Sequence, residues 1–190
     1  MIDVRHWGTT DAERRATYPA DRYLENPDDV VYRAVDVDAP ADVTFRWLCQ
    51  LRVAPYSYDW IDNFGRQSPG TLTPGLEQLA IGQTVMRLFE LVDFAPGRQI
   101  TARSRPSPFG VFAATYAVAP VDARRSRIIV KLIMRYPALL RTLGRWAMPF
   151  GDWVMMRRQL LNLKALAEDT ARRSQLSAAA GRDSSPRAPR

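Results

Sequence analysis

The chain has 190 residues, which suits one domain with a substantial core. Its single cysteine, Cys49, excludes an intrachain disulfide and agrees with a reducing compartment, so we expect a cytoplasmic protein. The formal net charge is +7, but residues 171–190 supply +4 of it. That segment has no aromatic side chain to stack on a base, so we expect no nucleic-acid partner.

The first 28 residues are polar and charged and have no clear period. We therefore expect an irregular N-terminal extension over residues 1–28, with Trp7 as a candidate anchor. Residues 30–37 alternate and predict a strand, in which three valines share one face. These are Val31, Val35 and Val37.

Two short helices are predicted after this strand. Pro40, with Asp38 nearby as a cap, is typical of a helix start, so we expect a helix over residues 40–50. After Pro55, residues 56–64 predict a second helix that stops at Gly65. Its aromatic side would carry Tyr56, Trp60 and Phe64.

Four strands follow a loop that is rich in proline and glycine. We expect them at residues 84–94, 98–104, 109–119 and 128–136, joined by turns as antiparallel neighbours. In the last strand apolar residues alternate with Arg127, Lys131 and Arg135, which indicates one core face and one wet face.

Residues 152–173 change to a period of 3.6, and no glycine or proline interrupts them. This predicts one long amphipathic helix. Its apolar stripe would be Trp153, Met156, Leu160, Leu163 and Ala167. Residues 174–190 are expected to form a disordered basic tail, which leaves residues 29–173 as the domain.

The order of these elements predicts an α+β protein in which a curved antiparallel sheet grips the long C-terminal helix, with two short helices after the first strand. The inner face of the sheet is the only large apolar surface left for that helix. A curved sheet that bends away from a helix leaves space, so we expect an apolar cavity between them.

This order resembles the START/Bet v 1-like superfamily, also called SRPBCC or polyketide cyclase/dehydrase-like, over residues 30–170. The segment Tyr56-Ser57-Tyr58-Asp59-Trp60 is similar to an actinobacterial-type branch of it. Weaker similarities are Asp38-Ala39-Pro40 and Ala95-Pro96-Gly97-Arg98. The resemblance implies a helix-grip fold with a cavity for a hydrophobic ligand. It implies no single reaction, because members include carriers, cyclases and hydrolases.

Several kinds of chemistry are disfavoured. The one histidine, His6, lies in the N-terminal extension, which argues against a histidine triad or a histidine-ligated metal. Cys49 is expected to be a small buried residue rather than a nucleophile. No glycine-rich nucleotide-binding motif is present. We therefore name no catalytic residue and expect neither a metal nor a cofactor.

The densest polar and aromatic cluster is Tyr56, Tyr58, Asp59 and Trp60. Tyr56 and Trp60 could pack on the sheet while the acid faces water, or Tyr58 and Asp59 could bind a ligand at the pocket mouth. The alternation of residues 84–94 puts Arg87 and Glu90 on opposite faces, so one of them would point inward.

The long helix and the strands supply the remaining cavity candidates. Arg157 borders the apolar stripe and either reaches a ligand carboxylate or extends outward along the helix. The other side chains expected around the cavity are apolar or aromatic. They are Phe89, Tyr116, Met134, Trp153, Met156 and Leu160.

Residues 136–150 alternate apolar and basic side chains. They predict a cover for the pocket, a transient membrane contact through Trp146, Phe150, Arg141 and Arg145, or a packed connection. Three functions therefore remain. The first is a carrier or sensor of a lipid-like or polycyclic molecule, the second a cyclase/dehydrase- or hydrolase-type enzyme, and the third a membrane-surface or protein-binding module.

Overall fold

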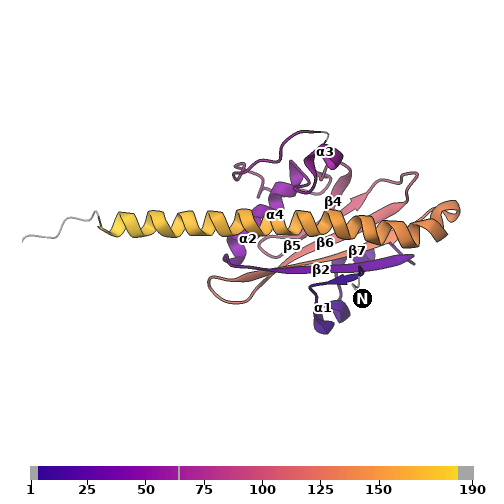
Figure 1. The fold of residues 1–190 in the computed structure, drawn as a ribbon, viewed down its shortest axis with the longest axis horizontal. Coiled ribbons are helices and arrows are strands. Elements are labelled where there is room, and N and C mark those ends of the chain that lie inside the picture. Colours follow the sequence, from indigo (N-terminus) through magenta and orange to yellow (C-terminus); the bar gives the residue numbers. More distant parts are fainter. Residues whose placement is uncertain (1–3, 64, 184–190) are drawn as a thin grey trace, which may run out of the picture.

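A computed structural model of the chain describes residues 4–63 and 65–183. It contains a seven-stranded sheet in the order β1-β2-β7-β6-β5-β4-β3, with one long helix, α4, lying across one face (Figure 1). Every pair of neighbouring strands is antiparallel except β1 and β2. This is the predicted α+β helix-grip arrangement.

The strands are short at the two edges and long in the middle of the sheet. Their bounds are β1 His6–Trp7, β2 Asp29–Val37, β3 Thr84–Val85, β4 Phe89–Ala95, β5 Gln99–Ser104, β6 Val111–Pro120 and β7 Ser126–Arg135. The helices are α1 Asp11–Arg15, α2 Ala41–Cys49, α3 Asp59–Asp62 and α4 Arg141–Asp183. Short 3-10 turns are η1 Pro19–Arg22, η2 Gln50–Arg52 and η3 Ala138–Leu140.

The core lies between α4, α2 and the inner face of the sheet. The alternation predicted for β6 and β7 is confirmed, since Tyr116 and Val130 belong to one buried cluster with Leu160 of α4. Cys49 is fully buried in the same cluster, and burial raises the pKa of its thiol to about 12. The cysteine is therefore a protonated packing residue, as expected.

The opposite face of the sheet is not the wet face that the alternation of β7 predicted. Ile133 is 1% exposed because Leu24 and Ala20 of the N-terminal segment pack against it. Lys131 is buried as well and pairs with Asp21 at 2.7 Å. The segment predicted to be irregular therefore contains β1, α1 and η1 and covers this face.

The strand predicted over residues 84–94 is a hairpin. Val85 pairs with Phe89, and Met86 and Arg87 both have positive φ, at 46° and 63°. The Met86 amide donates to the carbonyl oxygen of Leu51 at 2.7 Å, which fixes the turn against η2. Side chains 84–94 therefore do not alternate through one strand.

Two helix boundaries also differ from the prediction. The second short helix is reduced to α3, because Tyr56 has a φ of 57° and cannot continue a helix. Phe64, predicted to share its aromatic side, lies outside the described residues. Helix α4 begins at Arg141 instead of residue 152 and continues to Asp183, past the predicted end. It therefore includes Pro149 and most of the segment predicted to be a cover.

Within residues 4–63 and 65–183, no helix combines the length and hydropathy that crossing a bilayer requires.

Candidate ligand pocket

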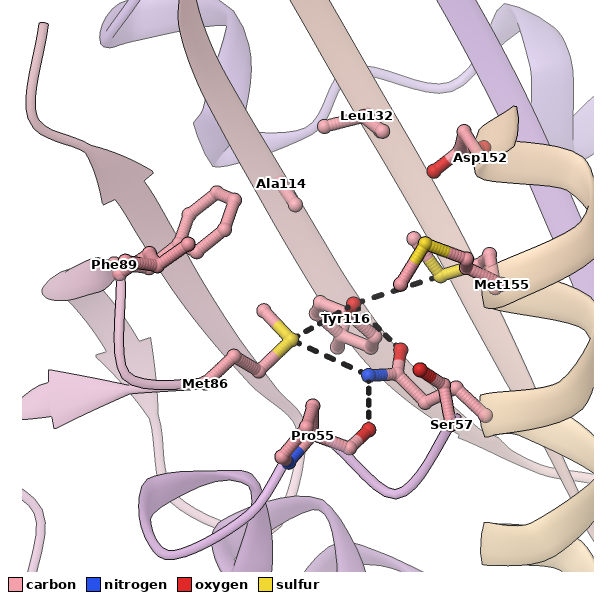
Figure 2. Close-up of a pocket in the computed structure, with 12 residues that line it drawn as sticks. Pro55, Ser57, Met86, Phe89, Ala114, Tyr116, Leu132, Asp152 and Met155 are labelled. Atoms are coloured by element: carbon pink, nitrogen blue, oxygen red, sulfur yellow. Dashed lines mark hydrogen bonds between the residues drawn. The ribbon is translucent and has the colours of Figure 1, made fainter. Parts of the chain in front are cut away.

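A pocket of about 220 Å3 lies between the sheet and the first half of α4. Its walls come from β6, β7, the β3–β4 turn, the segment before α3 and helix α4 (Figure 2). The lining residues are Pro55, Ser57, Met86, Leu88, Phe89, Ala114, Tyr116, Leu132, Asp152, Met155, Met156 and Gln159.

Most of this lining is apolar. Ala114 and Leu132 line the pocket from the sheet, Met86 projects from the β3–β4 turn on one side, and Met155 lies on α4 on the other side (Figure 2). Leu88 is 70% exposed, so it marks the rim where the pocket opens. An apolar concavity with a few polar groups is the usual form of a small-molecule site.

One polar group of the pocket is a satisfied pair. The Tyr116 hydroxyl donates to Gln159 Oε1 at 2.8 Å, and the Gln159 Nε2 atom donates to the carbonyl oxygen of Pro55 (Figure 2). Burial raises the pKa of Tyr116 far above its usual range, and the Asp152 charge raises it further. Tyr116 is therefore a neutral hydroxyl that positions Gln159.

The second polar group is an ion pair at the other end of the pocket. The Arg33 Nη2 atom donates to Asp152 Oδ2 at 2.9 Å. Arg33 is fully buried, and its Nη1 atom donates to the carbonyl oxygens of Arg5 and Tyr32. These contacts hold the guanidinium still, so it fixes the position of the Asp152 carboxylate in turn.

Burial raises the pKa of Asp152 to about 6, against the opposing effect of Arg33. Figure 2 shows one of its carboxylate oxygens directed into the pocket. In the part of the chain that the structure describes, no group of three or more His, Cys, Asp or Glu could hold a metal ion. The polar side chains that line the pocket are Asp152, Tyr116, Gln159 and Ser57.

Three of the predicted cavity residues line this pocket. They are Phe89, Tyr116 and Met156. Met134 and Leu160 are buried in the surrounding core. Trp153 is half-buried, and Arg157 is exposed, with its guanidinium 5.7 Å from the centre of the Trp7 ring. Arg157 thus extends outward, which was one of the two orientations considered for it.

The aromatic cluster before and on α3 does not line the pocket. Tyr56 is buried and meets the edge of Trp47, with ring centres 6.0 Å apart, while Trp60 is 75% exposed. Asp59 accepts from the backbone and hydroxyl of Ser68, so it holds the following loop. Tyr58 is half-buried beside them.

We expected either Arg87 or Glu90 to point into the cavity, and the structure shows that neither does. Arg87 sits in the β3–β4 turn, and its Nε atom donates to Asn63 Oδ1 at 2.8 Å. Glu90 pairs in register with Thr84 and is half-buried. Neither residue lines the pocket, because the turn replaces the continuous strand that the prediction assumed.

The sequence analysis missed Arg33, Asp152, Gln159 and the two methionines Met86 and Met155. A signal for Arg33 existed, since it lies on the same alternation as the inward valines of β2. Gln159 is next to Leu160 on the inner side of α4. Asp152 carried no such signal, because its partner is 119 residues away in the chain.

A second hollow, of about 410 Å3, lies at the start of α4 and is lined by Arg5, Arg141, Thr142 and Arg145. Arg5 pairs with Asp29 and Arg141 with Asp28, both at 3.0 Å, so much of the positive charge is neutralised. The side chain of Trp146 lies outside the described part of the chain. Membrane contact through this region stays a prediction.

No family model matches the chain, and no curated protein matches it. Two solved structures have a TM-score of 0.51 with it. One is the di-domain aromatase/cyclase BexL of the BE-7585A biosynthetic pathway, 17% identical over 74% of this chain and 46% of that chain. The other is a hypothetical protein from Helicobacter pylori, 12% identical over 80% of this chain and 95% of that chain.

The Zhui aromatase/cyclase from Streptomyces sp. R1128 is 18% identical over 77% of this chain and 95% of its own length, with a TM-score of 0.46. The chain spans less than half of BexL. At such identities, likeness speaks for the fold and leaves the activity open. Together with the sheet order and the position of α4, the likeness to the two structures with a TM-score of 0.51 shows that this chain has a helix-grip fold.

Proposed function

We propose that this protein binds an uncharged hydrophobic small molecule in the pocket between the sheet and α4, as a carrier or sensor. The observation that carries the proposal is the pocket itself. Its walls are mainly aliphatic, aromatic and thioether groups, and its few polar groups come from fixed positions on strands and α4. This combination buries an apolar body and orients it through a small number of hydrogen bonds.

The volume narrows the class of ligand. A cavity of about 150 Å3 holds a benzene molecule, whereas most drug-sized ligands occupy roughly 300–1,000 Å3. At about 220 Å3, this pocket suits a body of one or two rings. A sterol or a long acyl chain would extend past the rim at Leu88.

Native mass spectrometry of the freshly purified protein and titration with 1-(dimethylamino)naphthalene, a two-ring fluorescent probe that is uncharged at neutral pH, test binding. Ala114→Met would project a longer side chain into the pocket and should remove both bound mass and probe fluorescence. Ala119→Met makes the same change on the other face of β6 and should leave both intact. Absence of ligand and probe in the unaltered protein would overturn the proposal.

A second candidate is an enzyme of the cyclase/dehydrase type, because two titratable groups line one pocket. Asp152, with a pKa raised to about 6, could exchange a proton near neutral pH, and the neutral Tyr116 hydroxyl lies in the same pocket. BexL, whose fold is similar, is an aromatase/cyclase. Incubating any molecule recovered from the pocket with the protein and with its Asp152→Asn variant, and following its mass, would test for turnover.

A further inference from the structure

The polar groups of the pocket differ in how many of their hydrogen-bonding atoms remain available to a ligand. Tyr116 uses its hydroxyl proton on Gln159, and the Gln159 amide donates to Pro55 and contacts Met86 Sδ at 3.3 Å. This end of the pocket is therefore already satisfied by the protein. A ligand gains little there beyond contact with apolar surface.

Asp152 is different. Arg33 donates to Oδ2, while Oδ1 accepts no hydrogen bond from any residue between positions 4 and 183 that the structure describes. The carboxylate lines the pocket and directs an oxygen into it (Figure 2). An ionised oxygen in an apolar cavity is a strong acceptor that only a donor can satisfy.

The charge of the pair limits which donor fits. Arg33 has no exposed surface, and its positive charge is paired with the Asp152 carboxylate. A ligand ammonium would add a second cation without a second anion, and a ligand carboxylate would face Asp152 with like charge. Burying either unbalanced charge is costly. A hydroxyl group donates one proton to Oδ1 and leaves the pair neutral.

We propose that Asp152, held by Arg33, is the residue that selects an uncharged ligand with a hydroxyl group on an apolar body of one or two rings. A phenol or an aromatic alcohol has this chemistry. The inference rests on the proposed binding function and adds the class of ligand to it.

Three probes with the same two-ring body test this selection. Tetralin has no polar group, 1-tetralol has a hydroxyl and 1-tetralone has a ketone oxygen at the same carbon. Calorimetric titration near pH 8 should give 1-tetralol roughly tenfold higher affinity than tetralin, since a hydrogen bond to a charged group stabilises the complex. The ketone can only accept, so 1-tetralone should bind no more tightly than tetralin.

The Asp152→Asn variant should change this order. Arg33 only donates, so the amide oxygen of the variant must face Arg33 and its NH2 group must face the pocket. 1-Tetralone should then gain affinity and bind about as tightly as 1-tetralol, because the oxygen atoms of both probes can accept from this NH2 group. The control Met155→Ala alters an apolar lining residue of the same helix and should weaken all three probes by a similar factor.

Methyl NMR signals of Met86, Met155 and Met156 report whether a probe occupies this pocket. If tetralin shifts these signals while 1-tetralol gains nothing over it, the selection by Asp152 is overturned and the binding function stands. If 1-tetralone gains no affinity relative to 1-tetralol in Asp152→Asn, the selection is overturned as well. If neither these probes nor 1-(dimethylamino)naphthalene bind, both proposals fail. The comparison of the three probes on the unaltered protein tests the selection by Asp152 even if the variant does not fold.

Discussion

At the scale of single residues, Arg33 and Asp152 are two charged side chains in an apolar environment, which disfavours charge. Both are charged, yet they face a core built from valine, leucine and methionine. Such a pair stays stable only while each partner keeps the other, because a lone buried charge costs several kcal/mol. The same ion pair therefore contributes both to the stability of the fold and to the proposed ligand site.

The raised pKa of Asp152 predicts how its contribution to stability changes with pH. Its value in the folded chain is about 6, against an ordinary 3.8, so between these values the folded chain holds a proton that the unfolded chain has lost. The contribution to the free energy of unfolding is therefore largest below this window, falls through it and is level above it. Asp152→Asn cannot titrate and lacks this change.

Urea denaturation at several pH values measures the effect. The free energy of unfolding of the unaltered protein minus that of Asp152→Asn should fall between about pH 4 and 6, by an amount on the order of 1–3 kcal/mol. Asp122→Asn is the control with the opposite slope, because hydrogen bonds from the Arg124 backbone and the Arg125 side chain lower the pKa of Asp122. A difference for Asp152 that grows with pH would contradict the assignment.

At the scale of elements, α4 contains a defect that another element repairs. Pro149 lies inside the helix and has no N–H to donate to the carbonyl of Arg145. The Arg5 Nη2 atom donates to that carbonyl oxygen at 3.1 Å while it also pairs with Asp29. A side chain beside β1 thus supplies a hydrogen bond that the helix lacks.

Pro149→Ala should therefore stabilise the helix and make Arg5 less important. We expect the free energy of unfolding to rise by about 1–3 kcal/mol, and Arg5→Ala to cost less in the Pro149→Ala background than alone. A double-mutant cycle by chemical denaturation measures this coupling. Arg141→Ala, whose partner is Asp28, should instead add independently, and additivity for Arg5 would refute the repair.

The β3–β4 turn shows where local patterns stop being informative. Val85 to Phe89 contains no glycine, proline or asparagine, and apolar residues predominate, so alternation predicted a continuous strand. The turn instead forces Met86 and Arg87 to positive φ, which is uncommon for such residues. Contacts with η2 and Asn63 compensate for that strain, and the sequence around the turn does not reveal them.

At the scale of the whole molecule, the sheet has a core on each face. Leu24 is 3% exposed and packs with Ala20, Ala113 and Ile133 on the face away from α4. Leu24→Ala should lower the free energy of unfolding by about 2–4 kcal/mol, measured by urea denaturation.

Leu176→Ala is the matched control for this prediction. Leu176 is 67% exposed on the last part of α4, which extends beyond the sheet (Figure 1). Its replacement should change stability by no more than about 0.5 kcal/mol. Equal effects of the two substitutions would mean that the N-terminal segment does not cover a second core.

The sequence was sufficient to predict the central strands and the long helix, but not the N-terminal elements or the start of α4. Alternation in β6 and β7, and the stripe through Met156 and Leu160, were sufficient to predict a sheet gripping a helix. The start of α4 was missed because Pro149 usually breaks a helix. The N-terminal elements were missed because their few apolar residues show no period in the sequence and are buried only through contact with the sheet.

The candidate site was less predictable for a related reason. Phe89, Tyr116 and Met156 were found through periodicity, which reports the face of an element. The Arg33–Asp152 pair joins β2 to α4 across 119 residues, and no local spacing reports such a contact. The aromatic cluster at Tyr56–Trp60 was prominent in the sequence, yet it supports a loop instead of the pocket.

Three methionines, Met86, Met155 and Met156, line the pocket. Unbranched thioether side chains can change rotamer and follow ligands of different outline, so the pocket should tolerate variation in ring shape more readily than in polar groups. The same sulfur atoms are targets for peroxide, which converts each thioether to a polar sulfoxide. Oxidation of these methionines would thus make the pocket lining more polar and lower its affinity for an apolar ligand.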